Sequence, residues 1–260
     1  MGDALRFVWK YRWFAYFMTS KSSHTHLYRS VLGGAWHYLN PAAQMGIYWF
    51  LFVIVFQRQT PGLNPFLIIV TGITHYLFLN QCAIMGATSV SSREQVLLQI
   101  RLEPLLMVAV TYFELVRRLG FTLVIFALYA SFMIDWTRWE LLFYPLILAT
   151  LLLAGGCLAT ISGILAVYMR DLTQIIPLVM RLGLYFSPVI YPITFIPDNL
   201  VDIYLFNPIA CLFTCLQWSI MDVPLPGTAH LVSMCCCILT LMAATSWIYG
   251  KFAPNVTKAF

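Results

Sequence analysis

The sequence predicts an all-α integral membrane protein with six transmembrane helices. Of its 260 residues, 61% are hydrophobic and 10% are charged, whereas soluble domains have about 45–50% apolar and about 25% charged residues. Long uncharged stretches alternate with short charged segments, and a helix needs about 20 apolar residues to cross the bilayer core. The composition excludes an ordinary soluble globule, and residues 1–260 are predicted to form a single transmembrane domain.

Charged residues divide the chain into the predicted spans. Four runs contain no Asp, Glu, Lys or Arg, at 30–57, 59–92, 141–169 and 223–250. Two further apolar stretches carry charge: one contains Glu114, Arg117 and Arg118, and the other contains Arg181. We therefore predict spans at 35–56, 66–89, 105–133, 142–167, 174–195 and 229–249.

Basic residues predict which side of the membrane each connecting segment meets. Lys and Arg in the short flanks of spans favour the cytoplasm. With a cytoplasmic N-terminus, ten of the 15 Lys and Arg residues lie in inner segments and only Arg58 and Arg138 lie in outer ones. We therefore expect a multi-pass protein with both termini in the cytoplasm.

Residues 1–30 form the predicted cytoplasmic and interfacial N-terminus. Bulky aromatic side chains lie there among Arg6, Lys10 and Arg12, a pattern typical of a helix lying in the headgroup plane. A simple topogenic anchor and a specific role in guiding a ligand both fit this pattern.

The segment 93–103 is predicted to form a short amphipathic helix on the cytoplasmic side. Val96, Leu97 and Ile100 are apolar, and most of their neighbours are charged or carry amides. At 1.5 Å per residue this helix is roughly 15 Å long, too short to span a bilayer. It suits docking of a soluble partner, and a plain surface helix joining two spans is the alternative.

The stretch 203–221 is uncharged but is not predicted to be a seventh span. Asn207 and Pro208 interrupt it, acidic residues flank it, and a seventh crossing would move Lys251 and Lys258 to the outer side. We instead expect residues 198–222 to form a re-entrant or interfacial helix pair, which is tolerated where protein buries the irregular backbone. This pair is a candidate outer gate.

Polar side chains recur at helical spacing on the first and fifth predicted spans, where they share one helical face. The two stripes are His37, Asn40, Gln44 and Tyr48, and Gln174, Pro177, Arg181, Tyr185, Pro188 and Tyr191. Because polar groups facing hydrocarbon are costly, both stripes should face other helices or a wet cavity. Arg181 is the strongest functional candidate, since Arg suits a phosphate group and aromatic faces suit sugars. Interhelical hydrogen bonding is the alternative.

Two other spans have patterns that favour structural roles. Glu114 precedes Arg117 and Arg118 by three and four residues, which favours pairing within one helical turn. Small residues recur every four positions from Gly155 to Gly163. Such a stripe allows close approach of a neighbouring helix.

The sequence contains no motif for catalysis or nucleotide binding. A GxxxxGK[ST] loop is absent, so we do not expect this chain to hydrolyse ATP itself. HExxH, GxSxG and paired-carboxylate patterns are absent as well. The seven cysteines include no CxxC pair, which gives no indication of a metal site. We expect no enzymatic activity, no bound cofactor or metal, and no nucleic-acid partner.

Several short motifs, in a fixed order, resemble the transmembrane subunits of bacterial polysaccharide-exporting ABC transporters. They are Tyr28-Arg29-Ser30, Leu32-Gly33, Trp36, Asn40-Pro41, Arg170-Asp171-Leu172, Ser187-Pro188, Tyr191-Pro192 and Asn207-Pro208. The sequence is most similar to O-antigen export permeases, and capsule and teichoic-acid permeases are relatives. It departs from the family pattern at His24-Thr25-His26-Leu27 and at Arg117-Arg118.

The resemblance implies a homodimer in the bacterial inner membrane, joined to two copies of a separate ATPase that binds ATP and Mg. The interfacial helix, the coupling helix at 93–103 and the outer helices derived above occupy the family's positions for these elements. By the same analogy the first and fifth spans line the conduit for a lipid-linked polysaccharide. A capsule or teichoic-acid permease is the alternative, followed by a membrane-embedded transferase or a drug exporter.

The candidate site residues follow from these patterns and from the resemblance. The predicted conduit residues are Trp36, Tyr38, Gln44, Tyr48, Trp49, Arg181 and Tyr185. Contacts to the lipid phosphate at the inner interface are expected from Arg6, Arg12 and Arg29. Coupling to the ATPase is expected from Arg93, Glu94, Gln95, Gln99 and Arg101. The outer gate is placed at Asn207 and Pro208.

Overall fold

The computed structural model describes residues 11, 13, 18, 36–55, 62–95, 97, 103–134 and 136–258, and this part of the chain is helical without any strand. Its α-helices are α3 (Trp36–Trp49), α4 (Pro65–Ser89), α6 (Pro104–Ala130), α7 (Tyr144–Tyr168), α8 (Leu172–Tyr185), α9 (Asp198–Leu205), α10 (Pro208–Ile220) and α11 (Thr228–Phe252). The π-helical η2 (Phe50–Val55) continues α3. Short 3-10 turns lie at η3 (Ser91–Arg93), η4 (Trp139–Phe143), η5 (Ile193–Phe195) and η6 (Ala253–Lys258). The predicted all-α fold is confirmed.

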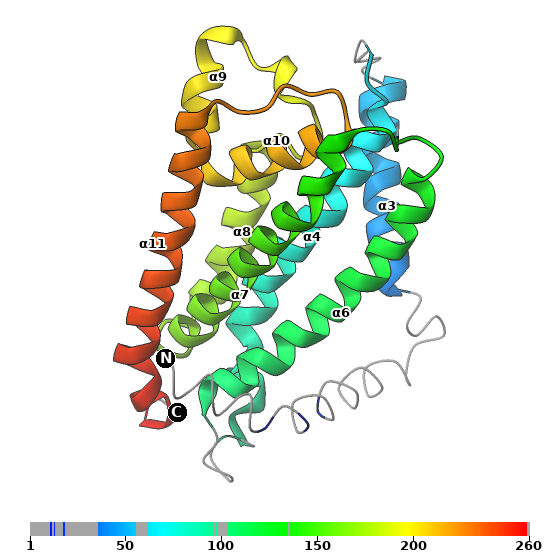
Figure 1. Ribbon diagram of the computed structural model, residues 1–260. Helices are drawn as coiled ribbons and strands as arrows, with labels where there is room; N and C mark the ends of the chain where they lie inside the picture. Colours follow the sequence, from blue (N-terminus) through cyan, green and yellow to red (C-terminus); the bar gives the residue numbers. More distant parts are fainter. Residues whose placement is uncertain are drawn as a thin grey trace.

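Helix α4 is the central helix of the bundle (Figure 1), and it contacts α3, α6, α7, α8 and α10. Its start is fixed locally, because the Asn64 side chain accepts hydrogen bonds from the backbone N–H groups of Phe66 and Leu67 at 3.0 and 3.4 Å. Pro65 occupies the first turn, where its missing N–H costs nothing. Most residues of α4 are buried against its neighbours.

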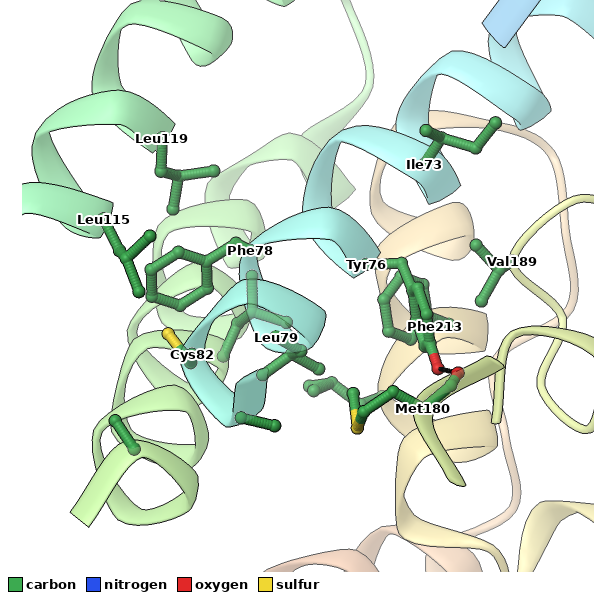
Figure 2. Packing of buried hydrophobic residues seen from close by; sticks show 14 of the residues in the cluster. Ile73, Tyr76, Phe78, Leu79, Cys82, Leu115, Leu119, Met180, Val189 and Phe213 are labelled. Atoms are coloured by element: carbon green, nitrogen blue, oxygen red, sulfur yellow. Dashed lines mark hydrogen bonds between the residues drawn. The ribbon is translucent and has the colours of Figure 1, made fainter. Parts of the chain in front are cut away.

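The two flanks of α4 pack against different helices (Figure 2). On one flank the Phe78 ring points toward Leu115 and Leu119 of α6. On the other flank the Tyr76 hydroxyl donates a hydrogen bond to the Met180 carbonyl of α8, and its ring lies 5.8 Å from that of Phe213 in α10. Helix α4 therefore separates an α6 side of the molecule from an α8 side.

Glycines bring α4 and α7 close together. A side-chain carbon on Gly163 would lie 2.9 Å from the Gly86 carbonyl oxygen, and one on Gly155 would lie 2.6 Å from the Phe78 ring. Only hydrogen atoms fit at these points, so the backbones can approach closely. The predicted packing role of the small-residue stripe on α7 is confirmed.

Each of the six predicted span ranges contains a helix, but within the described residues three helices are both long and apolar enough to cross a membrane. They are α4, the run from Trp139 to Tyr168 and the run from Thr228 to Val256. Helix α6 has 27 residues, yet every 18-residue stretch of it includes Glu114, Arg117 and Arg118. The pair α9 and α10, bent by 108°, would count as a fourth if it were a single broken span.

The helix in the fifth predicted span is shorter than predicted, because α8 ends at Tyr185 and not at residue 195. Pro188 and Pro192 follow this end, and each disfavours helical geometry in the residue before it. The chain then continues as a buried segment through Val189, whose carbonyl oxygen lies close against Gly72 of α4. A shorter helix and an irregular buried segment therefore replace the expected helix over 174–195.

The bundle has two distinct ends (Figure 1). Helices α9 and α10 lie at one end, together with the start of α11. The C-terminal ends of α4, α7 and α11 lie at the other, which places Arg93, Arg170 and Lys251 together there. Asp198, Asp202 and Asp222, the three acidic residues of 198–222, lie at the α9 end.

Candidate functional site

A cavity of about 310 Å³ lies between α3, α4 and α8, and we call it the α3–α8 cavity. Gln44 and Tyr48 line it from α3, and Arg181 lines it from α8. These are three of the predicted conduit residues, brought together from two spans far apart in the sequence. Pro177, Met180 and the other lining residues of α8 lie on the same side of that helix.

Tyr48 lies next to the polar stripe of α8. Its hydroxyl is close to the Tyr185 side chain and within electrostatic range of Arg181. The Tyr185 carbonyl in turn accepts a hydrogen bond from the Tyr191 hydroxyl at 2.7 Å. The Arg181 side chain remains exposed in this single chain. From the two predicted stripes the cavity therefore combines a cation, a phenol and an amide, groups that bind phosphate oxygens and sugar hydroxyls, and the Tyr185 side chain does not line it.

Helix α4 supplies two cavity residues that the sequence analysis missed. Tyr76 and Asn80 line the α3–α8 cavity from the α4 side. Asn80 lies near the middle of α4 in a run without charged residues, and an uncharged polar residue there is as costly in lipid as the polar residues of the first span. The same reasoning, applied to α4, would have found it.

Two predicted conduit residues lie elsewhere. Trp36 lines a different cavity, between α3, α4 and α6. The Trp49 ring packs edge-on against Phe66 at 6.1 Å. The side chain of Tyr38 lies outside the described part of the chain, as do Arg6, Arg12 and Arg29.

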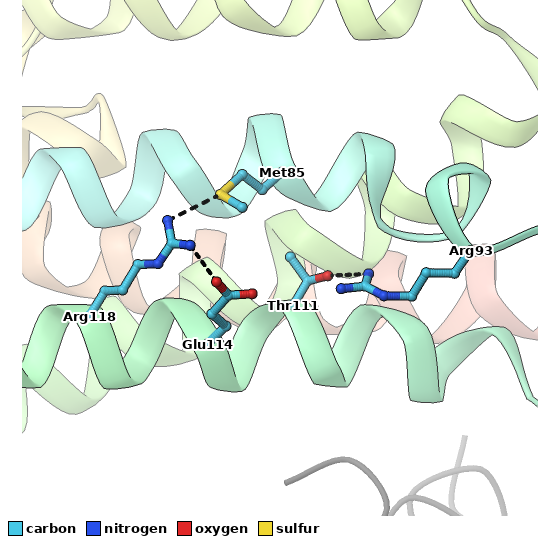
Figure 3. Close-up of polar contacts among 5 residues, drawn as sticks. All are labelled: Met85, Arg93, Thr111, Glu114 and Arg118. Carbon is cyan, nitrogen blue, oxygen red and sulfur yellow. Dashed lines mark hydrogen bonds and ion pairs between the residues drawn. The ribbon is translucent and has the colours of Figure 1, made fainter. Parts of the chain in front are cut away.

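The start of the predicted coupling segment is anchored to α4 and α6 (Figure 3). The Arg93 guanidinium donates to the Ser89 carbonyl at 3.1 Å and to the Thr111 hydroxyl of α6 at 2.9 Å. Burial lowers the pKa of Arg93, whereas the nearby Glu114 carboxylate raises it. A movement of this segment would therefore be transmitted to both helices. Gln99 and Arg101 lie outside the described residues, and docking of Glu94 and Gln95 stays a prediction.

Further along α6, Glu114 forms an ion pair and hydrogen bond with Arg118 (Figure 3). The spacing of four residues predicts this contact. Glu114 is almost fully buried, so its carboxylate depends on Arg118 for neutralisation.

Comparison with known proteins identifies the family. The sequence family described as ABC-2 type transporter matches residues 14–221, most of the chain. The chain belongs to the ABC-2 type transporter family. It is therefore a membrane permease and a transport subunit, not a catalytic enzyme.

Two curated relatives of this ABC-2 permease carry the same name. The O-antigen export system permease protein RfbA of Myxococcus xanthus is 25% identical over 262 residues, which cover 97% of this chain and 98% of the relative. The protein of that name from Klebsiella pneumoniae is 24% identical over 220 residues, which cover 82% of this chain and 80% of the relative. The similarity to the first relative therefore extends over nearly the full length of both chains.

In this permease, Asn207 joins α9 and α10 to α8. Its side-chain oxygen accepts a hydrogen bond from the Ile209 N–H at 3.0 Å and so caps α10, while its side-chain NH₂ donates to the Phe186 carbonyl at 3.2 Å. Pro208 occupies the first turn of α10. From the same helix, Gln217 donates to the Pro188 carbonyl at 2.7 Å. Asn207 and Pro208 thus produce the break between α9 and α10, and their role in gating stays a prediction.

Proposed function

We propose that this permease is the membrane-spanning subunit of an ATP-driven exporter that moves a lipid-linked polysaccharide of O-antigen type across the bacterial inner membrane. The observation that carries the proposal is the convergence of Gln44, Tyr48 and Arg181 on one cavity. This cavity lies in a chain that is similar over nearly its full length to an O-antigen export permease. Phenol and amide groups suit sugar hydroxyls, and Arg suits the phosphate of a lipid carrier.

The proposed topology has six spans, with α3 and η2 as the first and α8 as the fifth. The pair α9 and α10 is proposed to be re-entrant, because the chain enters and leaves it at the same end of the bundle (Figure 1). The 108° bend between the two helices supports this arrangement. The end that carries Arg93, Arg170 and Lys251 is proposed to be cytoplasmic, since basic flanks favour the cytoplasm.

Two copies of this permease are proposed to pair, with two copies of an ATPase docked on residues 93–103. The chain would bind no cofactor itself, and the ATPase would hold ATP and Mg. Because Arg93 is hydrogen bonded to both α4 and α6, closure of the ATPase would shift these two helices, of which α4 borders the α3–α8 cavity. Capsule and teichoic-acid glycans are alternative cargoes of the same mechanism.

The ATPase partnership is tested by purification. A tagged chain, expressed together with the products of its neighbouring genes and extracted in mild detergent, is expected to bring down an ATP-binding subunit in equal amount. The purified complex should hydrolyse ATP, whereas the permease alone should not. Recovery of the permease without any ATPase, from cells that make both proteins, would contradict the proposal.

A further inference from the structure

A second polar cavity lies on the other flank of α3. It has a volume of about 330 Å³ and is bordered by α3, α4 and α6, and we call it the α3–α6 cavity. Its polar lining comes from Asn40, Thr74, Gln81 and Arg118, and Trp36 lines it as well. The residues from α4 and α6 lie near the middle of both helices, so the cavity is at the depth where unpaired polar groups are most costly.

One polar group in this cavity lacks a partner. Thr74 is 2% exposed, and among the described residues its hydroxyl oxygen has no hydrogen-bond partner. Leaving a buried hydroxyl unpaired costs about 1–3 kcal/mol. The Thr74 side chain lines the cavity but its oxygen is covered, so rotation about χ1, for which Thr in a helix has two allowed positions, would bring the hydroxyl to a ligand in the cavity.

The charge in the cavity is balanced. One NH₂ group of Arg118 is paired with the Glu114 carboxylate, and the other has the Met85 sulfur, at 4.0 Å, as its only polar contact within the described part of the chain (Figure 3). Because thioether sulfur is a weak acceptor, this second NH₂ group can still donate to a ligand oxygen. The ion pair has no net charge, so nothing in the pair favours an anion over a neutral ligand.

We propose that the α3–α6 cavity is a second binding site for the transported glycan, and that it takes an uncharged sugar unit. This inference rests on the proposed function. The amides of Asn40 and Gln81 can both donate to and accept from hydroxyl groups. Arg118 donates a further hydrogen bond, and Trp36, which is 47% exposed, offers an aromatic face for the ring. The volume falls within the range of about 300–1,000 Å³ that is usual for small-ligand sites.

Two isosteric substitutions on α4 test this site. Thr71 and Thr74 both have a buried hydroxyl without a hydrogen-bond partner in the described part of the chain, but of the two only Thr74 lines the cavity. Thr74→Val is expected to lower the rate of glycan display at the cell surface by about 2- to 10-fold, as for the loss of one neutral hydrogen bond. Thr71→Val should leave display unchanged. Both variants should keep the wild-type melting temperature or exceed it, because an unpaired hydroxyl is replaced by a methyl group of the same shape.

The outcomes separate this proposal from the proposed function. Normal glycan display with Thr74→Val would overturn the second site. The proposed export function would nevertheless hold if Arg181→Ala blocks display. Normal display with Thr71→Val, Thr74→Val and Arg181→Ala, and also after deletion of the gene for this permease, would overturn the proposed function itself. A drop in display that is equal for Thr71→Val and Thr74→Val would also overturn the second site, because the effect would then come from α4 packing.

Photocrosslinking tests occupancy of the cavity directly. The photoreactive residue p-benzoylphenylalanine replaces Thr122, which lines the cavity, or Phe121, which is exposed on the same helix. Irradiation of glycan-producing cells should give a glycan-bearing adduct at position 122 and none at 121. Adducts at both positions, no glycan adduct at 122, or adducts with membrane lipid only would each overturn the second site.

Discussion

Replacement of Arg181 by Ala is expected to reduce surface display of the glycan by about 10- to 100-fold, the range for loss of a hydrogen bond to a charged group. Arg181 is the cation of the α3–α8 cavity, and Gln44 and Tyr48 face it from α3. Arg181→Lys should retain part of the activity, because Lys keeps the charge but loses the planar fork of donors that matches a phosphate. Display is measured by immunoblot of surface glycan against the amount of permease in the membrane.

Leu182→Ala is the matched control for Arg181. Leu182 is also exposed on α8 but does not line the cavity, so its substitution should leave display near the wild-type level. Normal display in cells with Arg181→Ala would contradict the role given to this residue. A failure of the variant to insert would be visible as loss of permease from the membrane fraction, and Arg181→Lys would then decide the question.

Substitution of Gly72 by Ala is expected to destabilise the fold strongly. A side-chain carbon at this position would lie 1.6 Å from the Val189 carbonyl oxygen, which is backbone and cannot rotate away. Overpacking usually costs about 1–3 kcal/mol, and a backbone neighbour places this site at the upper end of that range. The irregular segment after α8 would have to move, and its contacts with Gln217 would be lost.

The melting temperature of detergent-purified protein and its elution as a single species measure the effect of Gly72→Ala. Gly120→Ala is the control, because no other helix among the described residues comes within 4 Å of a side-chain carbon there, and Ala is favoured over Gly in a helix by about 0.5–1 kcal/mol. We expect the control to melt at or above the wild-type temperature. An unchanged melting temperature for Gly72→Ala would show that the segment at Val189 packs less closely than described.

Helical periodicity predicted much of the candidate site. At about 100° per residue, Gln44 and Tyr48 lie roughly 40° apart around α3 and enter the same cavity, whereas Trp36 lies about 120° from Tyr48. Trp36 therefore lines the α3–α6 cavity, although it belongs to the same helix. A list of aromatic residues on one span could not show this separation, because α3 presents two flanks to two different neighbours.

Composition could not identify the central helix. Among the described residues, helix α4 has the lowest mean hydropathy of the three helices that meet the length and composition expected of a span, yet it is the most buried of them. Its polar residues are tolerated because they face other helices: His75, for example, pairs with the Thr71 carbonyl at 2.7 Å and with the Tyr144 hydroxyl at 2.9 Å. The end of α8 was also missed, because an apolar stretch with prolines can continue as a buried irregular segment when another helix, here α10, satisfies its carbonyl groups.

The location of the lipid-linked glycan in cells depleted of this permease tests the central claim most directly. Glycan is detected by a lectin in inverted and in right-side-out inner-membrane vesicles. If the chain is an exporter, depletion should make lipid-linked glycan accumulate at the cytoplasmic face, where only inverted vesicles bind the lectin. Normal amounts at the periplasmic face would contradict export by this chain, and absence of any lipid-linked glycan would indicate a role in its synthesis instead.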